Sequence, residues 1–223
     1  MNQAELDSLL ADVEELKRAV RRNNPFLREV VSSRFFSAIS IPLGLLVVVF
    51  CTGTQVFITR RGSFFAVPAE WKLAAWILLG LFLVVGGVLK WILLSRKARS
   101  IEEGANFFSV LRAVYGGSWL HLNLPAVICM LLVPVFAILA GHPWYIVPGV
   151  AIFLAFPCNN LGLMVQRPEY LATGWYAMIA GLASLFSMEA IPFVWSGIIW
   201  GGDFLIFGII GLIARSRRRG SPV

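Results

Sequence analysis

The first long apolar run of the chain, Phe36–Ile58, reads FSAISIPLGLLVVVFCTGTQVFI. It contains no charged residue and exceeds the roughly 20 helical residues that cross the hydrocarbon core of a bilayer. Backbone polar groups in lipid find no hydrogen-bonding partner outside their own segment, so a run of this kind must be a helix. The chain is therefore expected to insert into a membrane.

Five further apolar runs follow. They occupy Trp71–Leu94, Leu122–Ala140, Trp144–Val165, Leu171–Ser187 and Ile191–Ala214. Composition agrees with this pattern, because 58% of the 223 residues are hydrophobic and the mean hydropathy is +0.79. A soluble domain of this size cannot bury so much apolar surface. We predict an all-α, polytopic membrane bundle of about six transmembrane helices, spanning residues 35–214.

Basic residues are distributed unevenly between the connecting segments. They are frequent before the first run, after the second and after the last, and Arg167 follows the fourth; the alternate loops carry only Arg60, Arg61 and Lys72, all in the first of them. Because cytoplasmic loops are enriched in lysine and arginine, both termini are expected to be cytoplasmic. The excess of arginine over lysine and the lack of an Asn-x-Ser/Thr acceptor favour a bacterial inner membrane. This placement also explains the net charge of +7 without invoking nucleic acid.

Residues 1–34 differ in character from the rest of the chain and form a separate N-terminal region. Apolar residues recur there at alternating steps of three and four, the spacing of a coiled-coil seam. We call this set the N-terminal seam; its members are Leu6, Leu9, Val13, Leu16 and Val20. The seam predicts a homo-oligomer or a protein partner bound through residues 2–22. An interfacial helix is the alternative, but the acidic start of this segment would be repelled by anionic lipid.

The end of the N-terminal region is basic instead of acidic. Residues 17–34 abut the first apolar run and carry several arginines, so they are expected to contact anionic lipid head groups. The tail after the last run, residues 215–223, is also basic. Both segments are therefore expected to lie at the cytoplasmic membrane surface.

Asp203 is the residue that stands out inside the membrane. It lies near the middle of the last apolar run, where a carboxylate costs about 2.5–3.5 kcal/mol on insertion scales. Two interpretations remain open. Asp203 is a proton- or cation-binding group facing a cavity, or it is a protonated or hydrogen-bonded residue that holds helices in register.

Asn159 and Asn160 are the expected partners of Asp203. They follow Pro157 in the fourth apolar run, where the proline frees a backbone carbonyl one turn earlier. Polar groups beside a broken membrane helix are typical of transporter sites, while a packing kink is the alternative. Asp203, Asn159 and Asn160 therefore form the predicted intramembrane polar site.

Small residues at four-residue spacing mark two of the runs. Thr173, Ala177 and Gly181 lie in the fifth run, and Gly197 and Gly201 form a G-x-x-x-G pattern in the sixth. This spacing lets helix backbones approach closely. We predict that these two helices pack directly on each other.

Several kinds of site are not expected. The three cysteines fall in apolar runs, where cysteine behaves as a small hydrophobe, and the two histidines fall near opposite membrane faces. No metal-ligand spacing, cofactor motif or hydrolase motif is found, so we predict no metal, no cofactor and no enzymatic activity. We predict a membrane subunit or scaffold that assembles through the N-terminal seam. The alternative is a small proton- or cation-linked transporter or channel with a midplane site around Asp203, Asn159 and Asn160.

Overall fold

The computed structural model describes residues 34–64, 67–101 and 118–219. These residues form α2 (Arg34–Arg61), α3 (Ala69–Ile101), α5 (Ser118–Leu139), α6 (Ile146–Val165), α7 (Pro168–Ser184), α8 (Pro192–Ser196) and α9 (Gly202–Arg219). A 3-10 turn, η2 (Pro143–Tyr145), precedes α6, and a π-helix, η3 (Gly197–Gly201), joins α8 to α9. No strand occurs in these three ranges, which confirms the all-α prediction for the described part of the chain. The N-terminal seam lies outside it.

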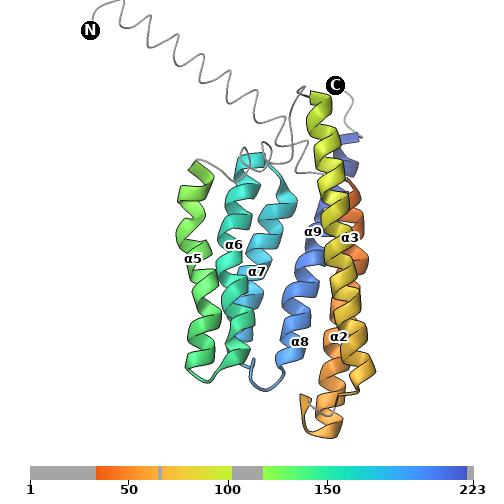
Figure 1. Ribbon diagram of the computed structural model, residues 1–223. Coiled ribbons are helices and arrows are strands. Elements are labelled where there is room, and N and C mark those ends of the chain that lie inside the picture. The colour runs from red at the N-terminus through yellow and green to blue at the C-terminus, as the bar shows by residue number, and fades with distance from the viewer. Residues whose placement is uncertain (1–33, 65–66, 102–117, 220–223) are drawn as a thin grey trace, which may run out of the picture.

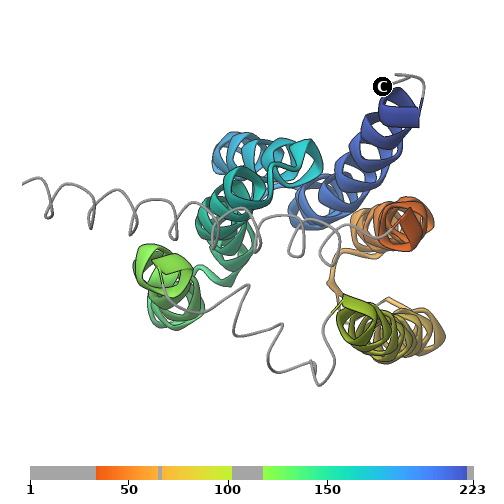
Figure 2. The same cartoon turned by 90° about the horizontal axis from the view of Figure 1, so that it is seen from above.

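The long helices run side by side (Figure 1). The start of α2 and the end of α9 lie at one end of the molecule, which we call the terminal end. The chain turns at Gly62 and Gly141, both with positive φ, at the opposite end, which we call the loop end. Viewed from above, α5, α6, α7, α9, α2 and α3 follow one another along an arc (Figure 2). The pairs α6–α7, α2–α9, α5–α6 and α7–α9 pack against each other and hold this arc together.

Within the described residues, four helical segments are long and apolar enough to cross a membrane. They are Phe36–Arg61, Leu120–Leu139, Pro143–Val165 and Pro192–Ser216. At most 33% of the residues in any of their apolar windows is buried inside the protein, so most of their apolar side chains lie on its surface. Exposed leucine and isoleucine in such numbers would aggregate in water but are solvated by lipid. The chain is therefore a multi-pass membrane protein, as the first, third, fourth and sixth apolar runs predicted.

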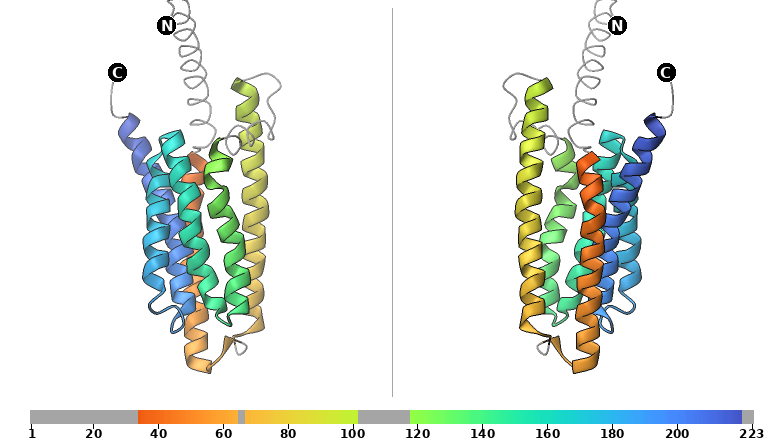
Figure 3. Two further views of the ribbon diagram at one scale, coloured as in Figure 1. Left: turned by 90° about the vertical axis from the view of Figure 1, so that its left-hand side faces the viewer. Right: turned by 90° about the vertical axis from the view of Figure 1, so that its right-hand side faces the viewer.

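The second and fifth predicted runs are helical as well but are not among these four segments. The run Trp71–Leu94 lies within α3, and the run Leu171–Ser187 overlaps α7, which has only 17 residues. Both helices run alongside the others (Figure 3). The limits of α7 are displaced from the prediction because Pro168 begins it, a position where the missing N–H of proline costs nothing.

The α2–α9 contact depends on glycines that leave no room for a side chain. A Cβ atom on Gly44 of α2 would lie 2.6 Å from the Gly201 carbonyl oxygen, and one on Gly201 would lie 2.9 Å from the Gly44 carbonyl oxygen. Gly197 likewise faces Cys51 of α2. The G-x-x-x-G pattern of the sixth run therefore packs on the first span.

The small residues of α7 face a different helix. A Cβ atom on Gly181 would lie 2.9 Å from Ile152 Cγ1 and 3.2 Å from the Pro148 carbonyl oxygen, both in α6. Ala177 is buried, and the Thr173 hydroxyl donates to the Glu169 carbonyl oxygen of its own helix at 2.8 Å. α7 and α9 do pack against each other, but the small-residue motifs themselves lie at other contacts, with α6 and with α2. Spacing indicates a close approach between helices but does not identify the partner helix.

Candidate intramembrane site

Asp203 lies in the first turn of α9, directly after the π-helix. The residue is only 7% exposed, and its Oδ1 atom is fully buried without a hydrogen-bond partner in the structure. A charge at such a position is costly unless a proton, a cation or a hydrogen-bond donor compensates it. The structure therefore places the one acidic residue of the last apolar run in a site where a compensating group is required.

Two side chains from other helices lie near Asp203, and one of them, Tyr176, lies directly against the neighbouring Gly202. Cys158 of α6 and Tyr176 of α7 are close enough to Asp203 to interact with it electrostatically. The Tyr176 hydroxyl donates to the Ile198 carbonyl oxygen in the π-helix at 2.8 Å. Three helices therefore converge on the carboxyl group. Neither Cys158 nor Tyr176 was predicted as a site residue, because nothing in the sequence pattern indicates which side chains of separate helices share a depth.

The π-helix positions Asp203 within this group. A π turn contains more residues than an α turn, so the residues after it are rotated relative to those before it. Gly197 and Gly201, at its two ends, are buried against α2, while Ile199 packs in a small core with Ala151 and Ala180. Helix interruptions of this kind are frequent at functional sites. A sequence analysis based on a regular 3.6-residue period cannot detect it.

The two asparagines predicted as partners of Asp203 point elsewhere. The Asn160 side-chain amide donates to Asn123 Oδ1 of α5 at 2.7 Å, and Asn123 is fully buried. Asn159 faces Gly174 of α7, and its Oδ1 atom has no hydrogen-bond partner in the structure. No hydrogen bond joins either asparagine to Asp203 in the described ranges. Asn160 and Asn123 instead connect α6 with α5. The predicted site residues Asp203, Asn159 and Asn160 therefore have different contact partners.

A second polar group lies at the terminal end of the same helices. Glu169, in the first turn of α7, is 1% exposed, and its Oε1 atom lies 4.0 Å from Arg215 Nη2 of α9. Arg167 and Ser37 are buried residues of the α6–α7 turn and of α2. The sequence analysis identified Arg167, Pro168 and Glu169 only as turn residues. Their burial depends on the packing of α2, α7 and α9 around them.

The loop end carries its own polar contacts. His142 Nδ1 lies 3.1 Å from Glu189 Oε1, with both side chains largely exposed. Gln55 Oε1 of α2 accepts from the Phe193 backbone N–H at 3.3 Å, and the Trp71 indole donates to the Thr54 hydroxyl at 3.0 Å. These contacts join the loops and helix ends. In residues 34–64, 67–101 and 118–219, no three potential metal-ligating side chains come together.

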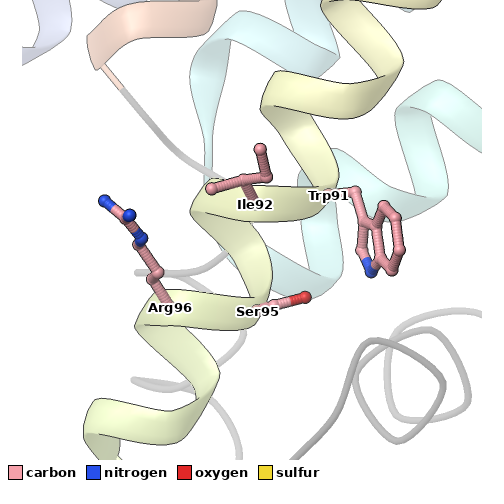
Figure 4. Close-up of a pocket in the computed structure, with 4 residues that line it drawn as sticks. All are labelled: Trp91, Ile92, Ser95 and Arg96. Atoms are coloured by element: carbon pink, nitrogen blue, oxygen red, sulfur yellow. The ribbon is translucent and has the colours of Figure 1, made fainter.

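A surface recess of about 250 Å³ lies on α3 (Figure 4). It is lined by Trp91, Ile92, Ser95 and Arg96. All four residues belong to one helix, and the recess contains no acidic group. It is therefore separate from the site around Asp203.

The chain matches no protein-family model, and no match was found among curated proteins or among solved structures. The functional argument therefore depends on the geometry of the site itself.

Proposed function

We propose that this protein translocates protons across a membrane, as a small channel or as a proton-linked transporter, and that Asp203 is the proton-binding group. One observation carries the proposal: Asp203 has a buried Oδ1 atom without a partner, next to a π-helix in an apolar span. Ionisable groups in membrane helices commonly mark ion or proton pathways, because their insertion is otherwise unfavourable.

A proton fits this site better than a metal cation. Hard cations need several oxygen ligands, six to eight in typical calcium sites. The described surroundings of Asp203 offer a thiol from Cys158 and a phenol from Tyr176 that already donates to a carbonyl oxygen. One carboxyl group is sufficient to bind and release a proton, whereas it is insufficient to coordinate a metal ion.

The proposal is tested with the full-length protein in vesicles that contain a pH-sensitive dye. A potassium gradient with valinomycin supplies the driving force, and protein-free vesicles give the background. Proton entry above background is the expected result, together with a pH-dependent carboxyl band in the infrared spectrum of the protein. If the reconstituted protein shows neither proton entry nor a titrating carboxyl band, the proposal is wrong.

We further propose six transmembrane helices, with α3 and α7 as the second and fifth, and both termini in the cytoplasm. By sequence, the basic residues at or beside the connections between helices are Arg96, Lys97, Arg99, Arg112 and Arg167 at the terminal end, and Arg60, Arg61 and Lys72 at the loop end. The excess of basic residues in the short loops alone is therefore small. The proposed orientation therefore depends mainly on the basic segments before α2 and at the end of α9.

Labelling of single cysteines tests this topology. In a variant without native cysteines, Ser63→Cys at the loop end should react with an impermeant reagent in intact cells. Ser221→Cys, in the C-terminal tail, should react only after the membrane is permeabilised. The opposite pattern would invert the proposed orientation, and reaction of both in intact cells would require an odd number of spans.

A second candidate function is a membrane scaffold that assembles through the N-terminal seam, Leu6, Leu9, Val13, Leu16 and Val20. The heptad-like spacing of these residues favours it. Such a subunit would form homo-oligomers or capture another protein in a bacterial inner membrane.

Replacement of Leu9 and Leu16 by Asp should abolish this assembly, because charge at seam positions prevents helix pairing. The mass of the complex in mild detergent, measured by light scattering, reports the result. The matched control is Glu5→Gln with Glu14→Gln, which leaves the apolar seam intact and should preserve the mass. An unchanged mass in the Asp variant would exclude assembly through the seam.

A further inference from the structure

The α7–α9 interface contains polar groups from mid-span to the terminal end. Four residues recur on α9 at four-residue intervals, and each lies near a residue of α7: Asp203, Phe207, Gly211 and Arg215. Asp203 interacts with Tyr176, and Phe207 stacks edge-on against Tyr170 with ring centroids 5.1 Å apart. A Cβ atom on Gly211 would lie 3.8 Å from Glu169 Cβ, and Arg215 pairs with Glu169 at 4.0 Å. One helix pair therefore connects the two polar groups of the bundle.

Glu169 occupies the terminal end of this connection. The residue is 1% exposed, whereas the side chain of its partner Arg215 is 19% exposed and reaches toward solvent. Along α9, Asp203 and Arg215 are separated by about 18 Å at 1.5 Å per residue, slightly more than half of the roughly 30 Å hydrocarbon core of a bilayer. Glu169 is therefore a buried acid next to a group that can contact water.

A third helix contributes to this terminal group. Ser37 of α2 is fully buried, and its hydroxyl oxygen has no hydrogen-bond partner in the structure. The hydroxyl lies against Gly211 of α9, the same residue that Glu169 approaches from α7. A buried hydroxyl can both donate and accept, so it can hold a water molecule or a proton in transit. The surroundings of Glu169 thus include a group suited to proton exchange.

We propose that Glu169 exchanges protons between Asp203 and the aqueous phase at the terminal end, with Arg215 as its counter-ion. This inference rests on the proposed function. A proton released by Asp203 passes along the α7–α9 interface, where Tyr170 supplies a phenol, and binds the carboxylate of Glu169. Protonation neutralises Glu169 and breaks its pairing with Arg215, whose guanidinium then turns to water. Release of the proton to water at the terminal end restores the pair, and Asp203 takes up its next proton from the opposite side of the membrane, so one proton is taken up for each proton released.

Glu169→Gln tests the proposal in the vesicle assay. It keeps the shape of the side chain but cannot carry a proton, and proton flux is expected to fall at least tenfold. The infrared band of the Asp203 carboxyl group should persist, because Asp203 itself is intact. Glu189→Gln is the matched control, since it changes another glutamate that pairs with a basic residue, but at the loop end. Its flux should equal that of the wild type.

A second variant separates relay from folding. Glu169→Gln leaves Arg215 without its counter-charge, which can destabilise a buried pair. Glu169→Gln with Arg215→Gln removes both charges, and its flux should also fall at least tenfold while its melting temperature stays near that of the wild type. Wild-type flux in either variant, with loss of flux in Asp203→Asn, would overturn the relay and leave the proposed function intact. Absence of flux in the wild-type protein would overturn both.

Discussion

Asp203→Asn is expected to abolish proton flux in reconstituted vesicles while the protein remains folded. Asparagine has nearly the same shape as aspartate and retains hydrogen-bonding capacity, but it does not titrate. The neighbouring contact between the Tyr176 hydroxyl and the Ile198 carbonyl oxygen does not involve Asp203 and should survive. Flux at the level of protein-free vesicles, with an unchanged melting temperature and elution volume, is therefore the expected outcome.

Two further variants separate a proton-binding role from a structural one. Glu70→Gln changes an exposed acid in the first turn of α3 and should leave flux unchanged. Asp203→Leu removes hydrogen bonding as well as charge. If Asp203 is only structural, this variant should lose about 1–2 kcal/mol, as for polar contacts between membrane helices. Wild-type flux in Asp203→Asn would eliminate Asp203 as the proton-binding group.

The helical class of the protein could be predicted from its sequence because lipid offers no hydrogen-bonding partner to the backbone. A long apolar run must satisfy its own backbone hydrogen bonds, so the runs at Phe36–Ile58, Leu122–Ala140, Trp144–Val165 and Ile191–Ala214 coincide with helical segments able to cross a membrane. Hydropathy does not specify helix partners. In lipid, apolar surfaces of all helices are chemically alike, so the arc of helices follows from packing details.

The small-residue motifs illustrate this limit. Gly197 and Gly201 leave no room for a side chain because α2 lies against them, although α7 and α9 also pack on each other. Gly44, which meets Gly201, is a single glycine in an apolar run. Its position opposite Gly201 depends on the tilt and rotation of both helices. A sequence motif on one helix does not predict which face of a neighbouring helix is turned toward it.

The candidate site was also predictable only in part. Asp203 was recognisable as an isolated acid in an apolar run, but its neighbours Cys158 and Tyr176 come from other helices. Consecutive residues of an α-helix point about 100° apart, so Asn159 and Asn160 could not both face one partner, and they contact different helices. In the sequence, Glu169 looks like a turn residue, but the packing of α2, α7 and α9 buries it.

Gly201→Leu is expected to disrupt the bundle. A Cβ atom at this position would lie 2.5 Å from Val48 Cγ2, 2.9 Å from the Gly44 carbonyl oxygen and 3.2 Å from the Val48 backbone nitrogen. Rotation of a side chain cannot relieve contacts with backbone atoms, so α2 and α9 would have to separate. Overpacking costs typically 1–3 kcal/mol and occasionally more, and we expect about 3 kcal/mol or more here because two backbones collide.

Gly80→Leu on α3 is the matched control for this substitution. A Cβ atom on Gly80 would meet nothing within 4 Å, so the same change in volume and hydropathy creates no clash there. Replacement of a helical glycine by leucine also improves helix propensity by several tenths of a kcal/mol. Thermal melting in mild detergent should therefore show a large loss of stability for Gly201→Leu and none for Gly80→Leu. Equal melting temperatures for the two variants would show that α2 and α9 do not depend on close backbone contact at Gly201, and that their association comes from the remaining side-chain packing.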